Sequence, residues 1–140
     1  MRKYKIGITF NLEAKVTDIW ANGANQNVIH LYHLFQHSDI VEDVVLVSWG
    51  PEKRTTPPEG FMLDGLNLKY AYIDDVIDQL DVLIEGTLVI EPHQVTRMHQ
   101  HGGKLFAIKW VMTLLWIWKI SFLIRKQEEC LMVRYLILYG

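Results

Sequence analysis

Short, almost wholly apolar runs recur along the first 110 residues, with polar or turn-rich segments between them. The runs cover residues 4–10, 44–49, 68–73, 82–85 and 105–110. Runs of this length with few polar residues are typical of strands buried on both faces, as in a parallel sheet covered by helices. The pattern therefore predicts five strands of one mainly parallel sheet.

Two helices are predicted between these runs. Residues 25–36 carry one apolar stripe with i, i+3, i+4 and i+7 spacing, made of Val28, Leu31, Tyr32 and Phe35. A second helix is predicted to begin at Pro92, because proline favours the first helical turn, and to end at the glycine pair 102–103. In that helix, Val95 and Met98 are expected to face the sheet.

Strands that alternate with helices predict an α/β fold with a Rossmann-like, open, mainly parallel sheet, formed as one domain over residues 1–110. Residues 50–67 hold three prolines and three glycines and are predicted to form a long surface loop. Ligands of such sheets bind outside the carboxyl ends of the strands. The expected site is therefore the segment after the first strand, residues 11–27. No GxGxxG follows that strand, so ordinary dinucleotide binding is not expected.

Composition narrows the classes of partner and compartment. The 140 residues are enough for one domain with a real core, and the formal net charge of -2 comes without any cluster of Lys and Arg. Nucleic acid is therefore not an expected partner. The single cysteine, Cys130, fits a reducing compartment. The opening MRKYKIGITF lacks the long apolar run of a signal peptide. We expect a first strand in a cytoplasmic protein.

The stretch IWANGANQN, residues 19–27, carries the candidate ligand chemistry. Asn22, Gln26 and Asn27 supply amide donors and acceptors. Gly23 permits close approach of the backbone, and Trp20 could stack on the apolar face of a ring. The stretch leads into the start of the first predicted helix, whose free N–H groups favour an anion or a hydroxyl acceptor. Asn and Gly are also the commonest loop and cap residues, so a purely structural interpretation stays open.

The same residues carry a resemblance. Trp20, Asn22, Gly23, Gln26 and Asn27 form a W-x-N-G-x-x-Q-N element, and residues 81–85 form a D-V-x-I-E element. Over about residues 4–110 the chain resembles a bacterial family known only as a domain of unknown function. That family is similar to the two-domain GT-B glycosyltransferases. The resemblance implies the N-terminal half of a GT-B-like fold, which holds the acceptor, while a second domain holds the nucleotide sugar. Catalysis in the cleft between the domains needs no bound metal.

The resemblance implies transfer of a sugar from a nucleotide sugar to a sugar or glycoconjugate acceptor, in surface polysaccharide or glycoconjugate synthesis. No cofactor is expected. Because 140 residues leave no room for a second domain, we expect this chain to be a truncated form that is inactive alone, and whether it is an enzyme stays open. Two other classes remain: a non-catalytic α/β module that binds a small ligand or a protein, and a small protein with a membrane-associated C-terminal helix.

Other polar groups favour structural interpretations. His30, His33 and His37 share one helix face and could converge on zinc, but no further ligand is near in sequence, so a solvated or half-buried face is favoured. The acidic segment 74–81 could serve acid–base chemistry, but a short solvated helix with Asp in its first turn is simpler. Glu85 ends a predicted strand where ligands gather, and we retain it as a candidate polar contact.

The end of the chain is unusually apolar, with three tryptophans in KWVMTLLWIWKISFLI, residues 109–124. A membrane-spanning helix needs about 20 mostly apolar residues. Lys109 and Lys119 interrupt the candidate span, and each costs roughly 2.5–3.5 kcal/mol near the bilayer centre. Snorkelling could rescue a lysine near one end. Membrane association through the tail is therefore disfavoured.

The genetic code suggests another origin for this tail. Trp and Met have one codon each, so a shifted reading frame must encode Gly, Asp, Asp and Glu at the pairs 110–111, 112–113, 116–117 and 118–119. The shifted frame is thus polar where the present frame is apolar. We predict that residues 111–140 are an irregular or helical apolar tail produced by a frameshift and foreign to the family.

Overall fold

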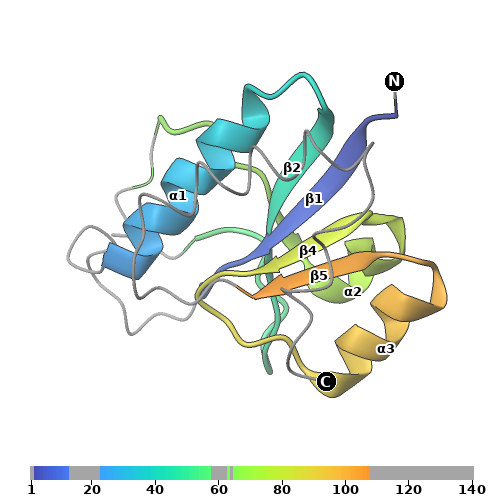
Figure 1. Cartoon of the computed structure of the whole chain (residues 1–140). Helices are drawn as coiled ribbons and strands as arrows, with labels where there is room; N and C mark the ends of the chain where they lie inside the picture. The colour runs from blue at the N-terminus through green and yellow to red at the C-terminus, as the bar shows by residue number, and fades with distance from the viewer. Residues whose placement is uncertain (1, 13–22, 58–62, 64, 108–140) are drawn as a thin grey trace.

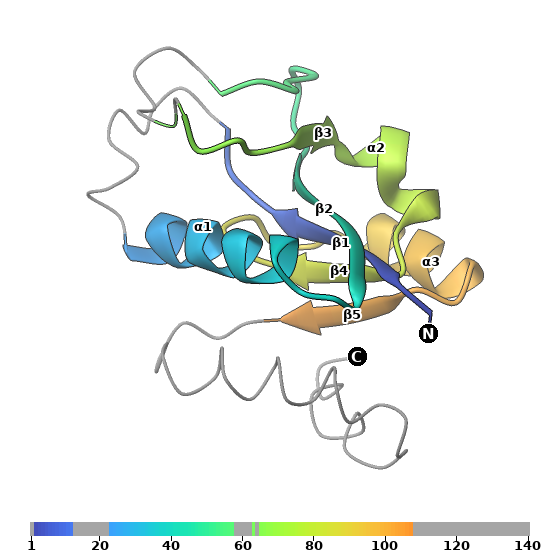
Figure 2. The same cartoon turned by 90° about the horizontal axis from the view of Figure 1, so that it is seen from above.

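The computed structural model describes residues 2–12, 23–57, 63 and 65–107, which build one sheet flanked by helices (Figures 1 and 2). The elements in chain order are β1 (Tyr4–Thr9), α1 (Gly23–Gln36), β2 (Val41–Ser48), β3 (Tyr70–Tyr72), α2 (Ile73–Val76), the 3₁₀ helix η2 (Ile77–Gln79), β4 (Val82–Glu85), α3 (Pro92–Gln100) and β5 (Lys104–Ala107).

The five strands form one sheet in the order β3-β2-β1-β4-β5, and every neighbouring pair is parallel. In its centre, Ile6 of β1 is in register with Val44 of β2 and with Val82 of β4. The prediction of a Rossmann-like α/β fold with an open parallel sheet is therefore confirmed. The second strand begins earlier than predicted, the third is shorter, and the last three residues predicted for the fifth lie outside the described residues.

Helix α1 covers one face of the sheet (Figure 1). Its predicted stripe is confirmed, because all four of its residues are at most 3% exposed. They pack in one cluster with Ile6 and Ile8 of β1, Val44 and Leu46 of β2, and Ile84 of β4. Alternate residues of a strand point to opposite faces, so these side chains form the core on the α1 side.

The opposite face is covered by α2, η2 and α3. Its core contains Val47, Leu83, Ile73, Ile77, Leu80 and Met98. Helix α3 begins at Pro92 as predicted, and Met98 is fully buried. Val95 is only half-buried, and Gln94 is the second fully buried residue of the helix.

Gln94 can be buried because its side chain belongs to a capping box. Its Oε1 accepts a hydrogen bond from the backbone N–H of Glu91 at 2.9 Å, while the Glu91 side chain caps the backbone of Gln94. Such a pair satisfies two N–H groups that the start of a helix leaves free. The predicted loop over residues 50–67 has no helix or strand in its described part.

Candidate functional site

The strand order places the topological switch point between β1 and β4. From β1 the chain moves outward to β2 and β3, and then returns to the other side of β1 to form β4 and β5. All five carboxyl ends lie along one edge of the sheet because the strands are parallel. Ligands of open α/β sheets bind outside this edge.

At the switch point itself, the loop after β4 is bound tightly to the end of β1. The buried hydroxyl of Thr9 accepts hydrogen bonds from the backbone N–H groups of Gly86 at 2.7 Å and Leu88 at 3.3 Å. It donates to the carbonyl of Leu88 at 2.6 Å. Thr87 donates its N–H to the Thr9 carbonyl at 3.0 Å, and its hydroxyl accepts from Asn11 N at 2.9 Å. We call these five residues the β1–β4 junction.

A glycine makes this close approach of two strands to a helix feasible. A Cβ on Gly86 would lie 2.2 Å from the carbonyl oxygen of Thr9 and 2.9 Å from Cγ2 of Val28 on α1. No side chain fits at the first distance, so the strand, the loop and the helix meet here only because residue 86 is glycine. The junction leaves no room for a ligand between these backbones.

The structure places half of the predicted ligand residues on one helix start. Gly23 is the exposed first residue of α1, and Gln26 and Asn27 are half-buried in its first two turns. Trp20 and Asn22 lie outside the described residues. That these residues bind a ligand stays a prediction.

Glu85 has a different surrounding from the one predicted. It ends β4, as expected, but its Oε2 accepts a hydrogen bond from the backbone N–H of Ile90 at 3.2 Å. The carboxylate therefore closes the loop between β4 and α3. This contact gives Glu85 a structural role whether or not it also meets a ligand.

A cleft of about 330 Å³ opens beside the junction, on the same edge of the sheet. It lies where the loop after β2, the start of α2 and the start of α3 face one another. Its lining residues are Trp49, Gly50, Pro51, Tyr72, Asp74, Glu91, His93 and Gln94. We call it the β2–α3 cleft.

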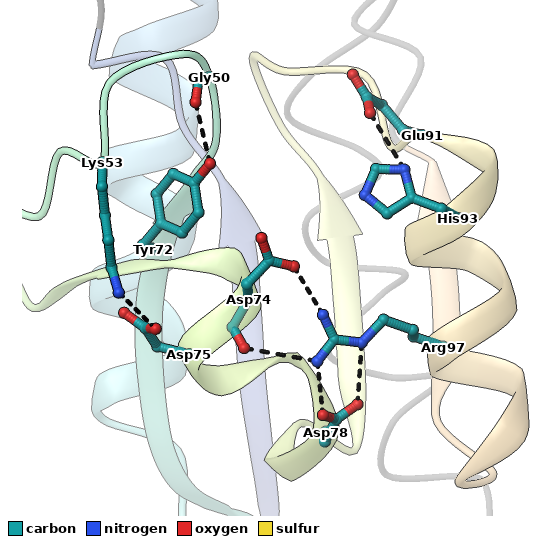
Figure 3. A network of polar contacts seen from close by, with 9 residues as sticks. All are labelled: Gly50, Lys53, Tyr72, Asp74, Asp75, Asp78, Glu91, His93 and Arg97. Atoms are coloured by element: carbon teal, nitrogen blue, oxygen red, sulfur yellow. Dashed lines mark hydrogen bonds and ion pairs between the residues drawn. The ribbon is translucent and has the colours of Figure 1, made fainter.

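Hydrogen bonds and ion pairs hold one side of the cleft in place (Figure 3). The Tyr72 hydroxyl donates to the carbonyl of Gly50 at 3.0 Å, which ties the end of β3 to the loop after β2. Lys53 extends from this loop, and its Nζ lies 2.7 Å from Asp75 Oδ1 and 5.7 Å from the centroid of the Tyr72 ring. The aromatic ring of Tyr72 is thus held against the loop after β2, a segment distant from it in sequence.

Arg97 connects α3 to α2 and η2 at the base of the network in Figure 3. Its guanidinium contacts Asp74 Oδ1 at 2.7 Å and Asp78 Oδ2 at 2.6 Å. The hydrogen bond from Arg97 holds the pKa of Asp78 below its ordinary value and in return raises the pKa of Arg97. Asp74 also lines the cleft, so Arg97 positions one of its carboxylates.

The start of α3 forms the other side, where Glu91 Oε2 lies 3.3 Å from His93 Nδ1. Both side chains remain accessible, at 50% and 60% exposure, and lie across from Tyr72 and Asp74 in Figure 3. Gln94 lines the same wall but is only 1% exposed. Its Nε2 is buried and has no hydrogen-bond partner among the described residues. A buried donor without a partner is costly, at about 1–3 kcal/mol.

Sequence reasoning missed this cleft, although a usable signal was present. The rule that ligands gather at carboxyl ends of strands was applied to the first and fourth predicted strands, but not to the second and third. Trp49 follows β2, Asp74 follows β3, and Glu91 precedes Pro92. The same rule, applied to every predicted strand together with the predicted helix start, points to all three.

The other clusters have the solvated surroundings that were favoured. His30 and His37 are exposed and His33 is half-buried, and the described residues contain no group of three metal-ligating side chains that could hold an ion. The acidic segment forms α2 and η2, with Asp74 and Asp75 in the first turn of α2. Asp81 lies beyond them, where it accepts hydrogen bonds from the Lys5 backbone at 2.9 Å and from Arg2 at 2.6 Å. Partial burial raises the pKa of Asp81, but the hydrogen bonds from Lys5 and Arg2 outweigh it, so the pKa lies below its ordinary value.

These features define an α/β domain with a Rossmann-like parallel sheet and a polar, aromatic-lined cleft at its carboxyl edge. The chain belongs to a family described as protein of unknown function (DUF2827), whose model matches residues 6–128. The match extends beyond residue 110, and the tail boundary predicted there stays a prediction. No curated protein and no solved structure matches the chain. In the part of the chain that the structure describes, no helix has the length and apolar character needed to cross a membrane.

Proposed function

We propose that this domain is the acceptor-binding half of a GT-B-type glycosyltransferase, which transfers a sugar from a nucleotide sugar to an acceptor in surface polysaccharide or glycoconjugate synthesis. One observation carries the proposal. The all-parallel sheet brings the amide-rich start of α1 and the β2–α3 cleft to the same carboxyl edge. That edge is where a sheet of this topology presents its ligand.

The chemistry of the edge suits a hydroxyl-bearing acceptor. Gln26 and Asn27 carry amides that can both donate and accept, as a sugar hydroxyl does. Aromatic and carboxylate side chains line the neighbouring cleft. Transfer between two bound substrates depends mainly on holding them in the reactive orientation. In a GT-B arrangement this domain would orient the acceptor, while a second domain would present the nucleotide sugar.

The test uses longer relatives that carry the second α/β domain implied by the resemblance to two-domain enzymes. Each is incubated with a panel of nucleotide sugars and with acceptor fractions from bacterial surface glycans, and release of nucleotide is measured. Acceptor-dependent release supports the proposal. Binding of acceptor without release from any donor contradicts it and favours the non-catalytic binding module.

A matched pair of variants on α1 tests the site. The residues at the positions of Asn27 and Gln36 are changed to Ala in the longer enzyme. Asn27 lies at the start of the helix and Gln36 at its end. Loss of the contact between residue 27 and the sugar acceptor should lower kcat/KM for that acceptor roughly tenfold or more. The change at position 36 should leave kcat/KM within about twofold of the original value. Equal effects of both variants would remove the start of α1 from the site.

The origin of residues 111–140 in a shifted reading frame remains part of the proposal. The gene sequence tests it directly. An open alternative frame that continues into a second α/β domain supports the frameshift. Stop codons in that frame within a few codons of position 111 refute it.

A further inference from the structure

The β2–α3 cleft has the size of a small ligand site. Its volume of about 330 Å³ lies at the lower end of the range for ligand pockets, roughly 300–1,000 Å³. It is built from three segments far apart in sequence, residues 49–51, 72–74 and 91–94, which hydrogen bonds hold in place. A cleft of this size suits one ring with its substituents rather than a whole nucleotide sugar.

The charges around the cleft disfavour an anionic ligand. Two carboxylates, Asp74 and Glu91, line it, and no Lys or Arg is among its described lining residues. The neighbouring cations are already paired, Lys53 with Asp75 and Arg97 with two aspartates. His93, the remaining lining group that can become cationic, lies 3.3 Å from Glu91. A phosphate placed here would therefore face two carboxylates and no unpaired cation among the described lining residues.

The hydrogen-bonding groups instead match hydroxyls. The carboxylates of Asp74 and Glu91 are acceptors, and each is half exposed. Gln94 contributes a buried amide donor without a described partner. A sugar hydroxyl both donates and accepts, so one ring can use both kinds of group. Trp49 and Tyr72 add apolar aromatic surface for the C–H face of such a ring.

We infer that the β2–α3 cleft binds an uncharged sugar ring of the acceptor, with Asp74 and Glu91 accepting hydrogen bonds from its hydroxyls and Gln94 donating one. The choice of a sugar rests on the proposed function, whereas the preference for an uncharged ring over a phosphorylated one rests on the cleft itself. The site is separate from the amide-rich start of α1.

Arg97 provides an unusually well-matched control. Asp74 and Asp78 both pair with its guanidinium, at 2.7 and 2.6 Å, but only Asp74 lines the cleft. Asp74→Asn and Asp78→Asn each remove one carboxylate from the same arginine. Any effect of Arg97 itself should therefore appear in both variants, and an effect of the cleft only in the first.

The experiment titrates the full-length chain with methyl glycosides of glucose, galactose, mannose and rhamnose, followed by ¹H–¹⁵N NMR. We expect at least one glycoside to shift the amide signals of Gly50, Tyr72 and Gln94. Asp74→Asn should weaken binding of this glycoside roughly tenfold or more, because a charged hydrogen-bond acceptor is lost. Asp78→Asn should change the binding less than about twofold. Equal weakening in both variants, or no binding by any glycoside, overturns the inference.

A second variant tests the amide donor without breaking the helix cap. Gln94→Glu keeps an oxygen for the Glu91 N–H but removes the Nε2 donor. We expect weaker glycoside binding with the circular dichroism of the folded protein retained. Should this variant fail to fold, the aspartate pair still decides the question.

Phosphorylated ligands test the charge preference and separate this inference from the proposed function. Inorganic phosphate or glucose 6-phosphate that binds the cleft more tightly than every neutral glycoside overturns the inference. Glycoside binding in the cleft, without turnover by any longer family member, leaves the cleft assignment standing and removes the transferase. Turnover by a longer member that the Asp74→Asn change does not affect leaves the transferase standing and removes the cleft from its acceptor site.

Discussion

The two halves of the carboxyl edge are built in opposite ways. At the β1–β4 junction, Thr9 is 0% exposed and its hydroxyl joins three backbone groups of the facing loop. In the β2–α3 cleft, Asp74, Glu91 and His93 keep half or more of their side-chain surface exposed. The switch point, where the topology favours a ligand, is closed between the described backbones, and the open space lies beside it.

The course of the loop after β4 explains this difference. The loop first turns back over the end of β1, because Gly86 allows close contact, and then continues to α3 on the other face of the sheet. The start of α3 and the loop after β2 line opposite sides of the cleft. Polar side chains that need water or a ligand gather in the space between them.

Gly86→Ala should have the largest effect, because it forces the junction open. The new Cβ would lie 2.2 Å from a backbone oxygen, which no side-chain rotation can relieve. We expect a loss of about 3 kcal/mol or more in the free energy of unfolding, measured by urea denaturation.

Gly23→Ala is the control for this change. A Cβ on Gly23 would meet nothing within 4 Å. It should leave the free energy of unfolding unchanged or raise it slightly, because alanine is the better helix former. A similar stability of the two variants would show that the junction is not tightly closed.

Thr9→Val should come next, because it keeps the shape of the side chain and removes the hydroxyl. The N–H groups of Gly86 and Leu88 then lose a buried acceptor. We expect a loss of about 2–3 kcal/mol in the free energy of unfolding. Thr9→Ser restores the hydroxyl and should recover most of it, and failure to recover would assign the loss to packing.

The smallest effect is expected outside the cleft, for Asp78→Asn. The Arg97 pair is exposed to solvent, so its contribution near neutral pH should be small and should fall further in high salt. Because Arg97 lowers the pKa of Asp78, this contribution is present above the ordinary value of 3.8 and is lost as the pH falls below it. The variant and the original chain should therefore converge in acid. A difference that persists there would point to a non-electrostatic cause.

Local patterns in the sequence were enough to predict most of the elements. The stripe of α1, the first turn of α3 at Pro92 and the bounds of β4 were all confirmed. Each depends on properties of neighbouring residues, such as side-chain spacing and the fixed φ of proline. The candidate loop could be named for the same reason, although a ligand there remains a prediction.

The burial of Gln94 in α3 shows where local reasoning fails. Hydrophobicity favours Val95 over Gln94 for the buried face, yet the structure buries Gln94 because its amide caps the helix start. The direction from which a helix meets its sheet depends on the loops at both ends. A residue's own polarity does not contain that information.

The sequence by itself therefore determined an α/β domain with a parallel sheet, because strand and helix periodicity are local properties. Only the tertiary structure decided which part of the carboxyl edge is closed and which is open. That outcome depends on a contact between residues 9 and 86 and on the meeting of Trp49, Tyr72 and Glu91. Such contacts join segments tens of residues apart, and their geometry is set by packing across the sheet rather than by any local pattern.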